Sequence, residues 1–378
     1  MKAVLSLSSL GLRKAVEEIK PYQPGKFAED IIDNFPNHEI VKLASNENPY
    51  GPYTNAIRSM QEEVNNLNKY PDTSFKILRE LLGTVHSISP DCICLSHGAE
   101  GMLQTIGKCF LSESDEVIIP DATYSLYNEI SKIMGAKIVL SPLKDYCIDM
   151  EAIVSRITPQ TKLIWLANPN NPTGTIVNKV YLDHLLEAIP STSWVILDEA
   201  YAEFSDYNTL PDRVRLIQEG KRLISVRTFS KAYGLAGARL GYAIADEKII
   251  TAINTVSEPF NANRIAIAGA LASIRDDQST MQDTIAKIKK ERFKTEEHLK
   301  RMGLRVIPSH ANFVLFEVPF DADEVCDELL QQGIILRSCS AWGYDHAIRV
   351  TIGMTHEMEV FRKALENTLN MLEQKKGR

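Results

Sequence analysis

Lys231 and the polar residues around it form the segment of this sequence best suited to chemistry. The lysine follows the apolar run 222–226, with hydroxyl side chains at Thr228 and Ser230 and a guanidinium at Arg239. A lysine amine forms a Schiff base with a carbonyl compound, and hydroxyl and guanidinium groups bind phosphate. The alternative is a solvated lysine in a loop, which is the usual state of a single lysine.

Three further polar segments each follow a short apolar run, at residues 96–102, 168–174 and 198–201. A carboxylate such as Asp198 at a buried strand end needs a cation or hydrogen-bond donors, unless it only caps the next helix. Backbone N–H groups of a helix that opens near Gly98 would bind an anion. The segment from Asn168 to Gly174 is also explained by a simple turn, because it is rich in proline, asparagine and glycine.

The elements that must position these segments alternate along the chain. The expected strands are 92–95, 116–119, 137–140, 162–167, 193–197, 222–226 and 240–244. The expected helices between most of them are 99–111, 124–134, 149–155, 179–188 and 247–255. This alternation predicts an α/β fold with a mostly parallel, seven-stranded-type sheet and helices on both faces. Ligands bind at the carboxyl ends of such strands, so the four polar segments should converge in one crevice.

The remaining sequence predicts an arm and a second domain. Residues 1–45 read as an N-terminal arm with a helix at 12–20, and residues 46–262 as the large domain. Residues 263–378 read as a smaller α+β domain. Its expected elements are long helices over 262–302, strands near 304–307, 313–317, 334–337 and 347–352, and a helix at 356–373.

Composition excludes several classes of protein. The chain has 378 residues and a net charge of -7, and it has no basic tract of the kind that binds nucleic acid. No apolar run reaches the roughly 18 residues of a membrane span. The six cysteines include a C-x-C pair without a histidine pair, which indicates free thiols in a reducing compartment and no metal site. The start has a faint resemblance to a signal peptide, but we expect a cytoplasmic protein.

A lysine, a carboxylate and a phosphate-binding group in one crevice point to a particular cofactor. Pyridoxal 5'-phosphate carries a phosphate, forms a Schiff base with lysine and needs a carboxylate beside its pyridinium nitrogen. Lys231 and Asp198 would supply these two groups, and Arg239 would contribute to the phosphate site. The sequence therefore predicts pyridoxal phosphate as the cofactor.

Three motifs also resemble those of a known family. They are Asn170-Asn171-Pro172-Thr173-Gly174, Asp198-Glu199-Ala200-Tyr201 and the run from Ser230 to Arg239 (SKAYGLAGAR). In this order and spacing the chain resembles the fold-type I aminotransferases of class I/II, most closely those that act on histidinol phosphate. The resemblance extends over nearly the whole chain, from Lys20 to Gly353.

The resemblance implies roles for residues around the cofactor. Lys231 would bind it covalently and move the substrate's α-proton, and Asp198 would pair with the ring nitrogen. Asn171 and Tyr201 would hydrogen-bond its phenolic oxygen, and Tyr124 would stack on the ring. The phosphate would be held by Ala99, Glu100, Thr228, Ser230 and Arg239.

The resemblance also implies partners. Tyr70 would reach the phosphate in the other subunit of a homodimer with shared active sites. Arg349 would bind the anionic end of the substrate, although arginines on such strands also form surface pairs. Arg337, Tyr22 and Asn46 would assist it. The small-molecule partners are then an amino donor and a keto acid, with histidinol phosphate and 2-oxoglutarate expected.

The phosphate loop departs from the family pattern. Where related enzymes read N-G-S/A-D-E, this chain reads His97-Gly98-Ala99-Glu100-Gly101. The change is either neutral or a sign of altered chemistry, because a histidine beside the cofactor could move protons near neutral pH. Two alternatives to the expected reaction therefore stay open. They are an aromatic amino-acid aminotransferase and an enzyme that oxidises an amino acid such as arginine with O2.

Overall fold

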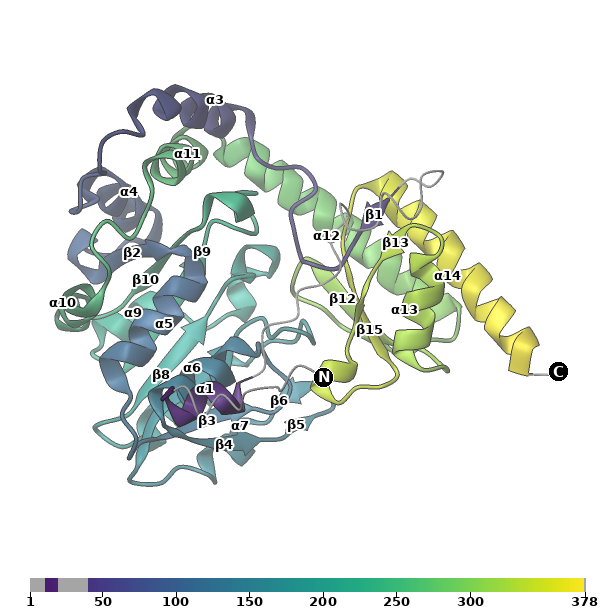
Figure 1. The fold of residues 1–378 in the computed structure, drawn as a ribbon, viewed down its shortest axis with the longest axis horizontal. Coiled ribbons are helices and arrows are strands. Elements are labelled where there is room, and N and C mark those ends of the chain that lie inside the picture. Colours follow the sequence, from purple (N-terminus) through teal and green to yellow (C-terminus); the bar gives the residue numbers. More distant parts are fainter. Residues whose placement is uncertain (1–10, 20–39, 377–378) are drawn as a thin grey trace.

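A computed structural model describes residues 11–19 and 40–376 of the chain. Its centre is a seven-stranded sheet in the order β2-β10-β9-β8-β7-β3-β4 (Figure 1). The strands are β2 (Ile93–His97), β3 (Glu116–Pro120), β4 (Lys137–Ser141), β7 (Thr161–Ala167), β8 (Trp194–Asp198), β9 (Leu223–Thr228) and β10 (Leu240–Ile244). β10 is antiparallel to both neighbours and the other pairs are parallel. The predicted α/β class and its mostly parallel sheet are confirmed.

Helices cover both faces of this sheet, so strand residues are apolar without alternation. Ile196 and Ile224 contribute to one core, and their neighbours Leu197 and Leu223 contribute to the other. The first core also contains residues of α5 (Gly98–Phe110), α6 (Leu126–Met134) and α10 (Glu247–Val256). The second contains residues of α4 (Lys76–His86), α7 (Met150–Val154), α8 (Lys179–Ala188) and α9 (Arg213–Gln218). The two faces thus have separate interiors.

The C-terminal part is a four-stranded antiparallel sheet in the order β11-β12-β15-β14. Its strands are β11 (Val306–Ile307), β12 (Phe313–Glu317), β14 (Arg337–Ser338) and β15 (Ala347–Thr351). Its helices are α13 (Ala322–Leu330) and α14 (Thr355–Lys376). The 24-residue α12 (Gln278–Arg301) leads from the large sheet to this part (Figure 1).

Smaller elements complete the described chain. They are α1 (Lys14–Glu18), β1 (Val41–Lys42), α3 (Thr54–Glu63), β5 (Leu143–Lys144), β6 (Cys147–Ile148), α11 (Arg264–Arg275), β13 (Ile334–Ile335) and the short 3-10 helices η2 (Val64–Asn66), η3 (Pro90–Cys92), η4 (Ala202–Phe204), η5 (Tyr207–Thr209), η6 (Ala236–Ala238) and η7 (Ser340–Trp342). Within the described ranges, no helix combines the length and the apolar character needed to cross a membrane.

One predicted strand divides in two. The sequence predicts a single strand over 334–337, whereas the structure has β13, which pairs in parallel with β1, and β14, which pairs with β15. The physical reason is a change of partner, because the chain leaves one neighbour for another within a few residues. The pairing of Val41 with Ile334 joins the end of the expected arm to the C-terminal part.

Candidate active site

A cavity of about 720 Å³ lies where the carboxyl ends of the large sheet's strands face the C-terminal part. Its lining comes from the segments that follow β2, β3, β7, β8 and β9, and from the C-terminal sheet. The predicted site residues among its walls are Asn46, Ala99, Glu100, Tyr124, Asn171, Asp198, Tyr201, Thr228, Ser230, Lys231, Arg239, Arg337 and Arg349. The sequence-based expectation that the polar segments share one crevice therefore agrees with the structure.

Lys231 lies in a loop that follows β9. Its Nζ donates to the backbone oxygen of Ser45 at 3.2 Å. Burial, and then the nearby charge of Arg349, lowers the pKa of the Lys231 ammonium to about 8. Gly234 allows this loop to pack closely on Gly51, since a Cβ at position 234 would lie 2.7 Å from the Cα of Gly51. The result is an amine that is partly neutral near pH 8, held in one place.

Asp198 ends β8 and is buried. Its Oδ2 accepts a hydrogen bond from the Tyr127 hydroxyl at 2.7 Å, and its Oδ1 accepts one from the backbone N–H of Ala200 at 3.1 Å. Burial raises the pKa of the Asp198 carboxyl to about 6, although the two hydrogen bonds lower it. The carboxylate is therefore only partly compensated and would gain from a cationic ligand.

Tyr127 is a residue that sequence reasoning missed. It lies in α6, is fully buried, and stacks on Trp165 with ring centroids 5.3 Å apart. Its ring meets that of Tyr124 edge-on at 5.7 Å. The available signal was the spacing of the two tyrosines, because residues three apart share one side of a helical turn. The hydrogen bond from the Tyr127 hydroxyl to Asp198 could not be predicted from this spacing alone.

The start of α5 forms a cradle beside Arg239. Gly98 has φ +73°, and a Cβ there would lie 3.0 Å from Nη2 of Arg239. A Cβ on Gly241 would lie 2.4 Å from the backbone nitrogen of Ala99, so this glycine lets the helix start approach β10. The Glu100 carboxylate pairs with Arg239 at 2.8 Å and accepts a hydrogen bond from Tyr124. The cradle thus offers a helix N-terminus and a guanidinium to an anion.

The opposite wall of the cavity comes from the C-terminal sheet. Arg349 is buried in β15 and donates to the side chain of Asn171 and to the backbone oxygen of Ala44. Tyr201 accepts a hydrogen bond from Asn46 at 3.0 Å. Arg337 in β14 is the cross-strand neighbour of Arg349. Two guanidinium groups therefore occupy the same side of the cavity.

Two of the predicted site residues that the structure describes are not part of the cavity lining. Tyr70 is 76% exposed, does not line the cavity, and stacks on Phe260 with ring centroids 4.2 Å apart. His97 is exposed at the start of α5 and is not part of the cavity lining. Tyr22 lies outside the described residues.

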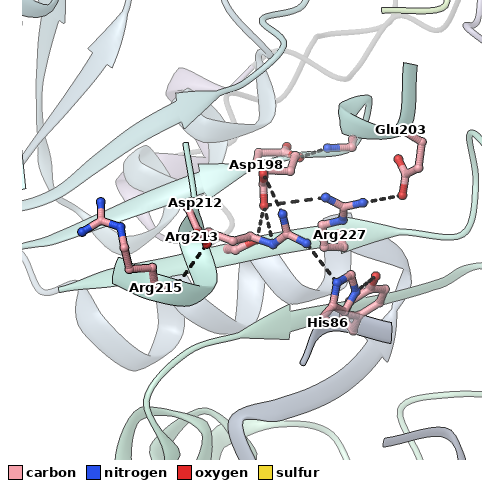
Figure 2. A network of polar contacts seen from close by, with 11 residues as sticks. His86, Asp198, Glu203, Asp212, Arg213, Arg215 and Arg227 are labelled. Atoms are coloured by element: carbon pink, nitrogen blue, oxygen red, sulfur yellow. Dashed lines mark hydrogen bonds and ion pairs between the residues drawn. The ribbon is translucent and has the colours of Figure 1, made fainter. Parts of the chain in front are cut away.

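A second group of charged side chains forms a network around the ends of β8 and β9 (Figure 2). Arg227 pairs with Glu203, and its other terminal nitrogen lies 3.8 Å from Glu199. Arg213 pairs with Glu199 at 3.1 Å and donates to Nδ1 of His86 at 3.0 Å. Because Arg227 immediately precedes Thr228 and Glu203 closely follows Tyr201, the network ties two cavity-lining segments together.

Comparisons with known proteins agree with this geometry. The family model described as aminotransferase class I and II matches residues 38–366. A histidinol-phosphate aminotransferase of Moorella thermoacetica is 35% identical over 94% of this chain and 92% of its own length. One from a Geobacillus species is 37% identical over 95% of this chain and 98% of its own.

Solved structures give the same answer. A histidinol-phosphate aminotransferase from Sinorhizobium meliloti, in complex with pyridoxal-5'-phosphate, has a TM-score of 0.86 at 26% identity and covers 96% of this chain and 98% of its own. Another from Clostridium acetobutylicum has a TM-score of 0.81 at 29% identity, over 88% and 99% of the two chains. Together with the motifs and the cavity, these matches show that the chain belongs to the class I and II aminotransferase family.

Proposed function

We propose that this chain is a pyridoxal-phosphate-dependent aminotransferase that transfers the amino group of histidinol phosphate to 2-oxoglutarate. The observation that carries the proposal is the arrangement of one cavity. It has Lys231 and Asp198 on the side of the large sheet and Arg337 and Arg349 on the side of the C-terminal sheet. The names and near-complete coverage of the relatives support the choice of substrate.

The residues present fit the cofactor. The cradle of Gly98, Ala99 and Arg239 would hold its phosphate, because the start of α5 offers N–H groups and Arg239 offers a guanidinium. Glycine at position 98 leaves room for this arginine, since a Cβ there would lie 3.0 Å from its Nη2. Asp198 is a buried carboxylate with a raised pKa, which suits a protonated ring nitrogen as its partner. When bound, pyridoxal phosphate supplies a carbonyl that condenses with amines and a ring that accepts electrons.

Lys231 supplies the proton chemistry. Because the pKa of Lys231 is lowered to about 8, a substantial fraction of the amine is neutral near pH 8. Neutral Nζ can accept the proton from the substrate's α-carbon and then donate it at a second position. Tyr201 is held by Asn46 and faces Lys231, whose Nζ lies 5.7 Å from the tyrosine ring centroid. The loop around Lys231 therefore keeps base and neighbouring hydroxyl in a fixed relation.

Arg349 and Arg337 would bind the anionic end of the substrate. Two guanidinium groups suit the phosphate of an amino donor, and a carboxylate of 2-oxoglutarate could use the same place in the second half of the reaction. An aromatic amino acid offers only one carboxylate to this pair. The alternative function, oxidation of an amino acid with O2, depends on His97 lying beside the cofactor. His97 does not line the cavity, so we do not propose this function.

We further propose a homodimer with shared active sites. Tyr70 and Phe260 stack on each other while 76% and 41% exposed, and Leu67 nearby in the chain is 56% exposed. Exposed apolar groups of this kind favour a protein partner, and a second copy is the simplest one. A dimer would bury Tyr70 and could bring its hydroxyl to the partner's phosphate cradle.

Two broader expectations also stay proposals. We propose a division into a large domain over 46–262 and a small one over 263–378, which the two separate sheets support. We also propose a cytoplasmic location, which suits six cysteines that form no disulfide, at positions 92, 94, 109, 147, 326 and 339.

The test is an absorbance titration of the purified, cofactor-loaded protein with histidinol phosphate and no keto acid. We expect the visible band of the lysine-linked cofactor to disappear as the aminated cofactor forms, and 2-oxoglutarate to restore it. Lys231→Ala should show no such band and should lose at least about a thousandfold in turnover while keeping its fold. An unchanged spectrum with histidinol phosphate, together with a response to aromatic amino acids, would contradict histidinol phosphate as the amino donor.

A further inference from the structure

Trp342 joins the two sides of the cavity. It ends η7, between the strands that carry the two substrate-facing arginines, and it lines the cavity. Its indole N–H donates to the backbone oxygen of Thr123 at 2.6 Å. Thr123 belongs to the segment after β3, on the large sheet, and directly precedes Tyr124. One side chain thus connects the C-terminal sheet to the wall from which Tyr124 projects.

The same indole ring lies beside both arginines. The guanidinium carbon of Arg337 lies 5.4 Å from the ring centroid, and that of Arg349 lies 5.9 Å from it. Both distances are within the range of cation–π attraction. Because Arg337 and Arg349 are opposite each other on paired strands, their like charges repel, and an aromatic ring between the strands offsets part of that repulsion.

The carbonyl that accepts the indole hydrogen bond is itself held in place. The Thr123 hydroxyl donates to the side-chain oxygen of Asn170 at 2.7 Å, and the Asn170 amide donates to the backbone oxygen of Ala122 at 3.0 Å. Asn170 and Thr123 are both buried. The indole is therefore anchored to a rigid part of the large sheet and not to a loose loop.

We propose that Trp342 is a positioning residue for the anionic end of the substrate, holding Arg337 and Arg349 as one receptor for a phosphate group and fixing it to the wall at Thr123. The choice of histidinol phosphate as the amino donor rests on the proposed function. The inference that the two arginines form a phosphate receptor rests on the contacts of Trp342. Trp342 acts through the arginines and through the hydrogen bond, so its loss should weaken binding more than it slows the chemical step.

Two substitutions separate the ring from its N–H group. Trp342→Leu removes both, and we expect the KM for histidinol phosphate to rise about tenfold or more, with kcat changed by less than about threefold. Trp342→Phe keeps a ring and removes only the hydrogen bond to Thr123. We expect it to recover most of the affinity and to remain about threefold weaker than the native enzyme.

Binding of inorganic phosphate to the cofactor-loaded enzyme, measured by calorimetry, gives a readout that does not need turnover. The cofactor fills its own phosphate cradle, so added phosphate reports on the arginine pair. We expect the dissociation constant to rise about tenfold in Trp342→Leu and about threefold in Trp342→Phe. Trp194→Phe is the matched control, since Trp194 packs on Phe110 away from the cavity and its replacement should leave phosphate affinity unchanged.

The outcomes distinguish this inference from the proposed function. Native phosphate affinity and native KM in both Trp342 variants would overturn it. If Trp342→Leu fails to fold, native phosphate affinity in Trp342→Phe alone would still overturn it. If histidinol phosphate is not a substrate but phosphate binding falls in the Trp342 variants, the receptor stands and only the choice of donor fails.

Discussion

Two neighbouring carboxylates, Asp198 and Glu199, face opposite sides of the central sheet and meet opposite conditions. Asp198 borders the cavity with a raised pKa and two hydrogen-bond donors as its partners. Glu199 is fully buried between Arg213 and Arg227 and also accepts a hydrogen bond from Ser225. Hydrogen bonds stabilise the charge of Asp198 only in part, whereas two arginines balance the charge of Glu199. Adjacent residues can therefore serve binding and stability separately.

The strand geometry produces this separation. Side chains alternate across a strand, so Arg227 and Ser225 point to the face of Glu199, whereas Val226 packs in the core on the face of Asp198. Figure 2 shows the balanced side, with Arg227 reaching Glu203 and Arg213 reaching His86. The comparison predicts that substitutions in the cavity reduce activity without loss of stability. Substitutions in the network should reduce stability and leave activity largely unchanged.

The largest effect on activity in this comparison is expected for Asp198→Asn. Turnover should fall by about 10²–10³-fold, because the carboxylate that balances the cofactor's ring is lost. The cofactor-free variant should nevertheless be more stable than the native protein at pH 8. Folding raises the pKa of the Asp198 carboxyl from 3.8 to about 6. The protonated carboxyl therefore contributes to the stability of the folded state in full below pH 3.8, and this contribution is lost as the pH rises through 6. The charged form then costs about 3 kcal/mol.

Urea unfolding of both cofactor-free proteins at pH 8 and pH 4 measures this gain. It should be clear at pH 8 and nearly absent at pH 4, where Asp198 is protonated. A variant that is less stable at pH 8 would mean that Asp198 is compensated like Glu199, and the contrast between the two faces would disappear.

Arg227→Met should produce the largest loss of stability. Glu203 would keep its buried position without its guanidinium partner, and removing one member of a buried pair costs about 3–5 kcal/mol. Arg215→Met is the matched control, because the Arg215 side chain is 46% exposed and pairs only with partly exposed carboxylates. The control should change the free energy of unfolding by less than about 1 kcal/mol. Equal losses in the two variants would show that burial of the network contributes nothing.

Tyr127→Phe tests the edge of the cavity where the two environments meet. Without the hydroxyl, the pKa of Asp198 should rise further, since a hydrogen bond to the charged carboxylate is lost. We expect the acid limb of the kcat/KM profile to move about one pH unit upward, with the largest loss below pH 7. Tyr181→Phe, at a tyrosine 49% exposed and outside the cavity, is the control. The same fractional loss at every pH would contradict this role.

The sequence predicted the large sheet well because its strands are short apolar runs between helical patterns. All seven runs became strands, and the polar segments after them met in one cavity. Partners across the sheet were not predictable. Nothing in the segment Asp198-Glu199 indicates that Arg213 and Arg227 flank the second carboxylate, because these contacts depend on how α9 and β9 pack. The hydroxyl of Tyr127 and the hydrogen bond of Trp342 were hidden for the same reason.

The smallest effect concerns His86, at the outer end of the network. Arg213 donates to its Nδ1, so Nε2 carries the proton and donates to the Tyr242 hydroxyl at 2.8 Å. Burial, followed by the charges of Arg213 and Arg227, lowers the pKa of His86 to about 2. A folded pKa below the unfolded 6.5 gives stability that is present above pH 6.5 and is lost as pH falls toward 2.

His86→Asn should remove this dependence while keeping an acceptor for Arg213. Between pH 6.5 and 5.5 the native protein should lose about 1 kcal/mol more than the variant, as one proton fewer is bound in the folded state. His184→Asn is the control, because His184 is an exposed histidine of α8. Parallel stability curves for the native protein and His86→Asn would mean that the network accepts a further positive charge. Such curves would contradict the proposed contrast between a charge-balanced network and a cavity whose carboxylate is only partly stabilised.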